Sequence, residues 1–299
     1  MKRFPFKKID AFTSGKSAGN PAGCIYLRKT GDISEADTQL IATELKGYVN
    51  EVVYLFPEKD CIFLRYYSAE CEVDFCGNGT IAAMYDYIST HSDLLNRYSV
   101  KIRVKDEYLD VYNRLKEEGS VYIMAPEPRY NDLNLSKTKI AAALDIKQSA
   151  ISASWGPALI NAGLNTLIVP LSGLSTCLEM KPGETKLKAF CLDNGIDIVL
   201  VFSQETAGKK NDFRTRVFAP KYGYLEDPAT GSGNSAFGYY LLKQGAWEGG
   251  TLNIEQNSSF DNPNTVKLST VKKAGVVRVL FGGAAMVKIE GQYITVNSN

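Results

Sequence analysis

The chain has 299 residues, of which 44% are hydrophobic and 22% charged, so it has the composition of an ordinary globular protein and the length of two domains. Its 34 Lys and Arg residues nearly balance its 33 Asp and Glu residues, and the net charge of +1 gives no electrostatic basis for binding nucleic acid. It has no apolar run of membrane-spanning length and no secretory leader pattern, so we expect a cytoplasmic protein that does not bind membranes.

Alternating and apolar segments predict the elements of the first half of the chain. Strands are expected at 6–12, 22–27, 50–56, 61–67, 100–104 and 120–125. A helix should begin after Ser34, whose hydroxyl can cap it, with Leu40 and Ile41 on its apolar face. A second helix, at 80–88, is apolar almost all round and should be buried on most sides.

The second half of the chain repeats this order. Strands are expected at 167–169, 196–202 and 215–220, followed by a glycine-bearing loop and an apolar helix at 234–242. Residues 126–150 contain two prolines and a helix at 136–144, and we interpret them as a connector. We therefore expect an N-terminal half at 1–125 and a C-terminal half at 151–299, with the last strand either in the C-terminal half or crossing back to the first.

Two glycine-bearing segments, about half the chain length apart, indicate a duplicated unit. When residues 76–85 are laid over residues 230–239, two glycines, an alanine and a tyrosine coincide. The coinciding pairs are Gly77/Gly231, Gly79/Gly233, Ala82/Ala236 and Tyr85/Tyr239.

Each of these segments lies where a loop enters a buried helix. The first backbone N–H groups of a helix have no partner inside it, and the helix dipole places partial positive charge there, so an anion is a natural ligand. A carboxylate, and the enolate-like charge that forms when a proton leaves the neighbouring carbon, would both fit such a site. The alternative for each loop alone is a simple helix cap.

Three side chains are candidates for the chemistry of a proton transfer. Glu51 begins an otherwise apolar strand, where burial would raise its pKa towards the range of a general acid/base. Asp227 precedes the second glycine loop and could accept a hydrogen bond from a substrate, or could cap the loop. Cys76 stands at the start of the first buried helix, where a thiolate is favoured, although a buried inert cysteine is the alternative.

Residues that bind metals are sparse. The six cysteines form no C-x-x-C pair, and His91, in a polar stretch, is the single histidine. We therefore expect no metal and no cofactor, and we expect His91 to be an ordinary surface residue rather than part of a catalytic triad.

With these segments the chain resembles the PhzF-like family of phenazine-biosynthesis-type isomerases. The matching pieces span the chain, and the last of them is the most specific. They are Asp10-Ala11-Phe12-Thr13, Ala18-Gly19-Asn20-Pro21, Asn50-Glu51, residues 65–79 and Glu226-Asp227-Pro228-Ala229-Thr230-Gly231-Ser232.

The resemblance implies an α+β fold like that of diaminopimelate epimerase, with two pseudo-symmetric halves, each a curved, mostly antiparallel sheet around a central helix, and a site in the cleft between them. It implies a cofactor-independent isomerase acting on a small carboxylate-bearing, cyclic or amino-acid-like substrate, and it is compatible with a homodimer. Glu51 would be the general acid/base and Asp227 would position the substrate. The implied substrate-binding residues are Asn20, Gly77, Asn78, Gly79, Thr230, Gly231 and Ser232.

One departure leaves alternatives open. Cys76-Gly77-Asn78-Gly79 is similar to the first signature of diaminopimelate epimerases and proline racemases, which use two cysteines, but Thr230 stands at the second position. A symmetric two-thiol racemase is therefore not expected. A Cys76-dependent epimerase, a dehydratase of a hydroxylated amino acid, and a non-catalytic protein that binds a small metabolite remain as alternative hypotheses.

Overall fold

A computed structural model describes residues 1–295, and these divide into two compact units. Unit 1 comprises Met1–Met124 and the chain from Gly282 onward, whereas unit 2 comprises Ala125–Phe281. The chain thus leaves unit 1 after residue 124 and returns to it after residue 281. Residues 126–150, which we interpreted as a connector, are part of unit 2.

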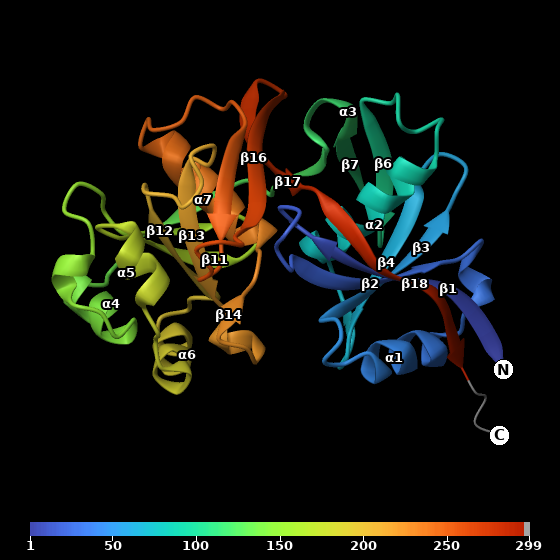
Figure 1. The fold of residues 1–299 in the computed structure, drawn as a ribbon, viewed down its shortest axis with the longest axis horizontal. Helices are drawn as coiled ribbons and strands as arrows, with labels where there is room; N and C mark the ends of the chain where they lie inside the picture. The colour runs from blue at the N-terminus through green and yellow to red at the C-terminus, as the bar shows by residue number, and fades with distance from the viewer. Residues whose placement is uncertain (296–299) are drawn as a thin grey trace. The chain divides into compact units, whose positions relative to one another are not determined.

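Unit 1 is a sheet that packs around one long helix, α2 (Figure 1). Its strands are β1 (Lys2–Ala11), β2 (Asn20–Tyr26), β3 (Glu51–Pro57), β4 (Ile62–Ser68), β5 (Glu72–Val73), β6 (Ser99–Val104), β7 (Glu107–Arg114), β8 (Ser120–Met124) and β18 (Ala285–Thr295). Its helices are α1 (Glu35–Glu44), α2 (Gly77–Thr90), α3 (Leu115–Glu118) and the 3₁₀ turn η1 (Thr30–Asp32). The pairs β2–β3 and β4–β6 are parallel, and the other pairs of this sheet are antiparallel.

Unit 2 packs its own strands around a second long helix, α7. Its strands are β9 (Arg129–Asn131), β10 (Ala158–Asn161), β11 (Asn165–Pro170), β12 (Ile198–Ser203), β13 (Phe213–Phe218), β14 (Glu226–Asp227), β15 (Leu252–Gln256) and β16 (Asn264–Lys273), and the chain returns to unit 1 within β17 (Val276–Gly283). Its helices are α4 (Lys137–Ala143), α5 (Leu174–Glu179), α6 (Glu184–Asp193) and α7 (Gly231–Lys243), with 3₁₀ turns η2 (Gln148–Ala150) and η3 (Pro220–Tyr222).

The strand pairing of unit 2 repeats that of unit 1. In unit 2, β11–β12 and β13–β15 are the parallel pairs, and they correspond in chain order to β2–β3 and β4–β6. β9 pairs with β10 as β18 pairs with β1. The mixed α/β fold of two similar halves that the sequence predicted is confirmed.

Alternation along β3 separates two layers in unit 1. Val52, Tyr54 and Phe56 pack with Ile41 of α1 in one cluster, which places Glu51 and Val53 on the opposite face, towards α2. Ser34 caps α1 as predicted, because its side chain accepts a hydrogen bond from the backbone N–H of Asp37.

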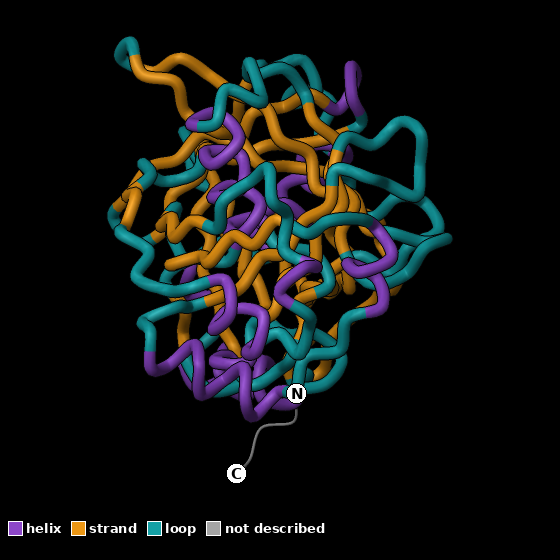
Figure 2. The backbone as a smooth tube through the Cα atoms, turned by 90° about the vertical axis from the view of Figure 1, so that its left-hand side faces the viewer, coloured by secondary structure: helices purple, strands orange, loops and turns teal. Residues whose placement is uncertain are grey.

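Unit 2 has the same two layers around its own sheet. α4, α5 and α6 bury side chains against Val199 and Val201 of β12. Phe202 points the other way and contacts Phe237 of α7, with ring centroids 4.6 Å apart. Figure 2 looks at the molecule from the side on which α4 and α6 lie in Figure 1, and shows helices and loops in front of part of the strands. Within residues 1–295, no helix is long and apolar enough to cross a membrane.

Candidate active site

Glu51 begins β3 and faces the start of α2. Its carboxyl lies within hydrogen-bonding reach of the side chains of Asn78 and Cys76, the residues at the start of that helix. Burial raises the pKa of Glu51 above its usual value, and these two polar neighbours only partly offset the effect. Glu51 is therefore a carboxyl group that holds its proton more tightly than an exposed glutamate does.

The helix start that contacts Glu51 is held together by a chain of side-chain hydrogen bonds. Cys76 is the N-cap of α2: its Sγ accepts from the N–H of Gly79 at 3.4 Å and donates to Oδ1 of Asn78 at 2.9 Å. Nδ2 of Asn78 donates to Oδ1 of Asn20 at 3.1 Å. Asn20, Glu51, Cys76 and Asn78 thus form one polar group, which we call the unit 1 cluster.

The close approach of α2 to β3 requires a glycine at position 79. A Cβ atom on Gly79 would lie 2.6 Å from Cγ2 of Val53, which is closer than real Cβ contacts come. The helix start can therefore lie against the same strand that carries Glu51 only because this side chain is missing.

Asp227 and Thr230 form the corresponding group in unit 2. The Thr230 hydroxyl donates a short hydrogen bond to Oδ2 of Asp227, and both residues are buried. Thr230 is the N-cap of α7, but its side chain does not cap the helix as Cys76 caps α2. The glycine at position 231 again allows a close approach, because a Cβ there would lie 2.4 Å from the Phe281 ring.

Gln256, which the sequence did not predict, completes this group. Its Oε1 accepts from the N–H of Thr230 at 3.0 Å and from Nδ2 of Asn234 at 2.7 Å. Its Nε2 donates to the carbonyl of Asp227 at 2.9 Å and to the Thr230 hydroxyl at 3.1 Å. We call Asp227, Thr230, Asn234 and Gln256 the unit 2 cluster.

The structure therefore brings the predicted residues together within each unit. Asn20, Glu51, Cys76 and Asn78 meet in unit 1, and Asp227 meets Thr230 in unit 2. The remaining predicted residues occupy the first turns of the two long helices: Gly77 and Gly79 in α2, Gly231 and Ser232 in α7.

The two repeats carry different chemistry at equivalent positions. The registers of β3 with β4 and of β12 with β13 make Ile198 the equivalent of Glu51. The registers of β4 with β5 and of β13 with β14 make Val73 the equivalent of Asp227. Each unit thus has an acidic residue where the other has an apolar one, so the fold itself requires neither carboxyl group.

One ion pair is retained in both repeats. Arg65 of β4 binds Glu72 of β5 through Nε and Nη2, both at 2.9 Å. Arg216 of β13 binds Glu226 of β14 through Nε at 2.9 Å and Nη2 at 2.8 Å. These bidentate pairs fasten the short strand that leads into each glycine turn.

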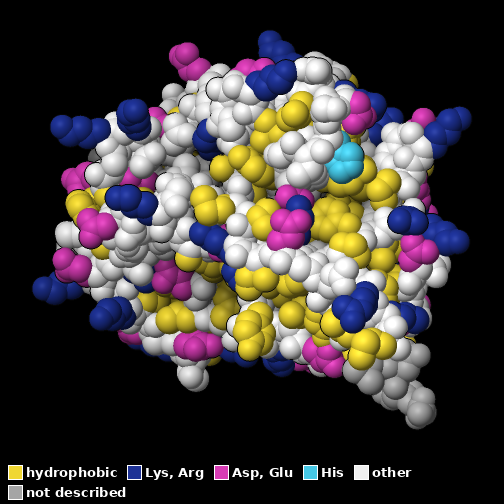
Figure 3. Space-filling model, turned by 45° about the vertical axis from the view of Figure 1, so that its right-hand side comes forward, with side chains coloured by type: hydrophobic (Ala, Val, Ile, Leu, Met, Phe, Trp, Pro, Cys, Tyr) yellow, Lys and Arg dark blue, Asp and Glu magenta, His cyan; other side chains and the backbone are white. Residues whose placement is uncertain are grey.

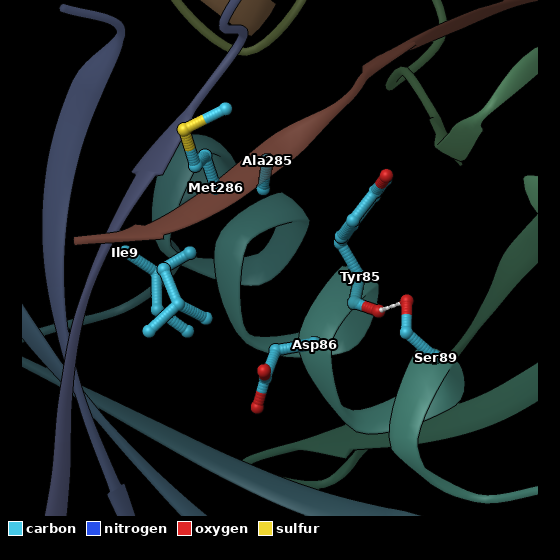
Figure 4. A pocket seen from close by; sticks show the side chains of 7 residues that line it. Ile9, Tyr85, Asp86, Ser89, Ala285 and Met286 are labelled. Carbon is cyan, nitrogen blue, oxygen red and sulfur yellow. Dashed lines mark hydrogen bonds between the residues drawn. The ribbon is translucent and has the colours of Figure 1, made fainter. Parts of the chain in front are cut away.

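A separate pocket of about 290 Å³ lies beside α2 in unit 1 (Figure 4). Its lining residues are Ile9, Tyr85, Asp86, Ser89, Ala285, Met286 and Val287. The carboxylate of Asp86 is paired with Lys7, and Ser89 donates to the carbonyl of Tyr85. None of the lining residues belongs to the unit 1 cluster, so we do not assign the chemistry to this pocket.

His91 is exposed, as expected. It follows α2, and its ring stacks on Tyr87 with centroids 3.9 Å apart. Figure 3 shows this histidine at the surface, where positive and negative side chains are interspersed. Residues 1–295 contain no group of three His, Cys, Asp or Glu side chains placed to hold one metal ion.

The chain matches known proteins along nearly its whole length. It is 28% identical to the uncharacterized isomerase YfhB of Bacillus subtilis, over 96% of this chain and 97% of that protein. The Bacillus anthracis phenazine biosynthesis protein of the PhzF family has a similar structure, with a TM-score of 0.86 at 24% identity and coverage of 99% and 100% of the two chains.

A more distant fold relative is a hydroxyproline epimerase from Agrobacterium vitis, with a TM-score of 0.59 at 12% identity and coverage of 98% and 91%. Its structure contains bound trans-4-hydroxy-L-proline. This likeness concerns the fold alone. The family is given by the sequence itself: residues 9–291 match the phenazine biosynthesis-like protein family, and the chain belongs to that family.

Proposed function

We propose that this chain is an isomerase that moves a proton within a small carboxylate-bearing substrate, with Glu51 as the general acid/base. The enzyme class is supported by the family and by curated relatives that are named isomerases. The observation that carries the mechanism is the placement of Glu51, whose half-buried carboxyl lies beside Asn78 and Cys76 at the start of α2.

The raised pKa of Glu51 suits this role. A general acid/base works best when its pKa lies close to the working pH, because it must both accept and return a proton. Burial shifts the pKa of Glu51 in that direction, and the polar side chains of Asn78 and Cys76 lie beside its carboxyl. The carboxyl is also absent from the equivalent position, Ile198, so its presence is better explained by chemistry than by folding.

The substrate anion would be bound by the helix starts. The first N–H groups of α2 and α7 carry the positive end of the helix dipole, and such groups stabilise a carboxylate and the enolate-like charge that develops next to it. Asp227 would accept a hydrogen bond from an amine or hydroxyl of the substrate.

Cys76 is the competing candidate for the base. Its Sγ donates to Oδ1 of Asn78 and accepts from the N–H of Gly79, so the thiol already serves as the cap of α2. We therefore assign Cys76 a supporting role beside Glu51.

The proposal is tested by deuterium wash-in, which reads proton exchange at carbon without requiring net turnover. The protein, dialysed against EDTA and without added cofactors, is incubated in D₂O with L-proline, trans-4-hydroxy-L-proline and cyclohexadiene carboxylates, and exchange is followed by NMR. We expect exchange into at least one compound and a loss of about a hundredfold or more in Glu51→Gln.

Glu70→Gln is the matched control, because Glu70 lies in the same unit and is exposed. It should leave the rate unchanged. Exchange at the wild-type rate in Glu51→Gln would overturn the assignment. Ligand-induced thermal stabilisation of the wild type without any exchange would favour a non-catalytic binding protein instead.

A further inference from the structure

The two repeats differ at one buried position in a way that folding does not require. Thr215 of β13 pairs with Gln256 of β15, and the equivalent strands of unit 1 pair Leu64 with Val104. Gln256 is fully buried, whereas Val104 shows that a small apolar side chain is compatible with the same place in the fold. A buried amide is costly unless all its hydrogen bonds are made, so a specific role for Gln256 is expected.

The orientation of the Gln256 amide is fixed by backbone groups. The N–H of Thr230 can only donate, so the atom of Gln256 that faces it is Oε1. The carbonyl of Asp227 can only accept, so the atom that faces it is Nε2. No other orientation of the amide satisfies both contacts.

This orientation determines the direction of the neighbouring hydrogen bond. Nε2 of Gln256 also donates to the Thr230 hydroxyl, which uses an oxygen lone pair and leaves the hydroxyl proton for Asp227. The resulting chain runs from Gln256 to Thr230 to Asp227, and each group donates to the next. The same contacts hold the Thr230 side chain away from the N–H groups of α7, which threonine at an N-cap otherwise bonds.

We propose that Gln256 is a positioning residue that turns the Thr230 hydroxyl onto Asp227 and thereby sets the carboxylate of Asp227 for the substrate. This inference rests on the proposed function, since it assigns Asp227 a substrate-facing role. Gln256 acts through Thr230 rather than by contact with the substrate.

The first test is a crystal structure of Gln256→Val, which copies the residue found at the equivalent position in unit 1. We expect the Thr230 hydroxyl to leave Asp227 and to cap α7. A structure in which the Thr230 to Asp227 hydrogen bond is unchanged would overturn the proposal, whatever the substrate is.

The second test is a double-mutant cycle in the wash-in assay with Gln256→Val and Thr230→Val. We expect the exchange rate of each single variant to be about tenfold or more below that of the wild type. The double variant should be no more than about threefold slower than Gln256→Val alone, because both changes break the same chain of hydrogen bonds. If the loss in the double variant equals the product of the two single losses, the proposal is overturned. Asn264→Ala is the matched control, because Asn264 also binds this loop, by donating a hydrogen bond to the carbonyl of Pro228. Its loss in exchange rate should multiply with the loss caused by Thr230→Val.

Gln256→Glu separates positioning from general loss of structure. Its carboxylate keeps an acceptor for the N–H of Thr230 but cannot donate, whereas its protonated form can donate to the Thr230 hydroxyl. We expect the ratio of its exchange rate to that of the wild type to rise as the pH falls, and a constant ratio would contradict the proposal.

If Glu51→Gln has no effect in the same assay, the proposed function fails. If Glu51→Gln behaves as expected and the cycle multiplies, only this inference fails.

Discussion

Glu51 and Ile198 occupy equivalent positions at the starts of β3 and β12. The same strand start therefore accepts a carboxyl group in one repeat and a branched apolar side chain in the other. Because burial raises the pKa of Glu51, its charged form is disfavoured by the folded state. Placing the charged form of Glu51 here therefore costs folding free energy in the first repeat, and the second repeat, which has Ile198, has no such cost.

This cost predicts a pH-dependent effect of Glu51→Gln on stability. A carboxyl group whose pKa is raised in the folded state stabilises the fold fully below the pKa of the unfolded chain, and this contribution is lost as the pH rises through the raised pKa. We therefore expect Glu51→Gln to have a higher Tm than the wild type at pH 8 and no such advantage at pH 4. Thermal unfolding at both pH values checks this, and an equal difference at both would contradict it.

Cys76→Ser should preserve the helix cap. A serine hydroxyl can donate to Oδ1 of Asn78 and accept from the N–H of Gly79, as the thiol does. We expect exchange within about tenfold of the wild type for Cys76→Ser and a loss of about 0.5–2 kcal/mol in unfolding free energy for Cys76→Ala. A loss in Cys76→Ser of about a thousandfold or more would assign the base to the thiol instead.

Gly231→Ala should destabilise unit 2 through a steric contact. The new Cβ would meet the Phe281 ring at 2.4 Å, and we expect a loss of about 1–3 kcal/mol, measured by urea unfolding. Gly31→Ala is the control, because a Cβ at that position meets no atom within 4 Å. Adding Phe281→Leu to Gly231→Ala should recover part of the loss, and no recovery would show that the contact is not its cause.

The two retained arginines should differ in their contribution to stability. Arg216 also donates to the carbonyls of Cys177 and Met180, at 2.9 and 2.7 Å, so Arg216→Met leaves buried acceptors as well as Glu226 without a partner. We expect this change to cost about 3–5 kcal/mol. Arg65 bonds the more exposed carboxylates of Glu35 and Glu72, and Arg65→Met should cost about 1 kcal/mol. Equal losses in urea unfolding would contradict the comparison.

Local signals in the sequence predicted local features well. Ser34 caps the helix expected after it, because a cap depends on residues only three positions apart. Ser136, expected as the first residue of its helix, is the N-cap of α4. The strand expected at 6–12 ends at Ala11, since Phe12 has a φ of 61° that no regular strand accommodates. Leu40, expected on the buried face of its helix, is 40% exposed, and Thr38 and Ala42 are buried instead.

The residues of the two clusters were predictable where they carry motifs, and not elsewhere. Glu51 begins β3 and Cys76 precedes α2, and their sequence context marked them as candidates. Gln256 has no such context, because it reaches Thr230 only through the parallel pairing of β13 with β15. The difference between the repeats at this position likewise became visible only when the strand registers aligned Val104 with Gln256.

The passage of the chain out of unit 1 and back into it has a consequence for biosynthesis. Unit 2 is one continuous stretch, so a ribosome can deliver all of it before the chain turns back at residue 282. The β1 strand must wait for β18, its antiparallel neighbour, until all of unit 2 has been translated. The segment that carries Glu51 is therefore translated before unit 2 but belongs to the unit that is completed after it.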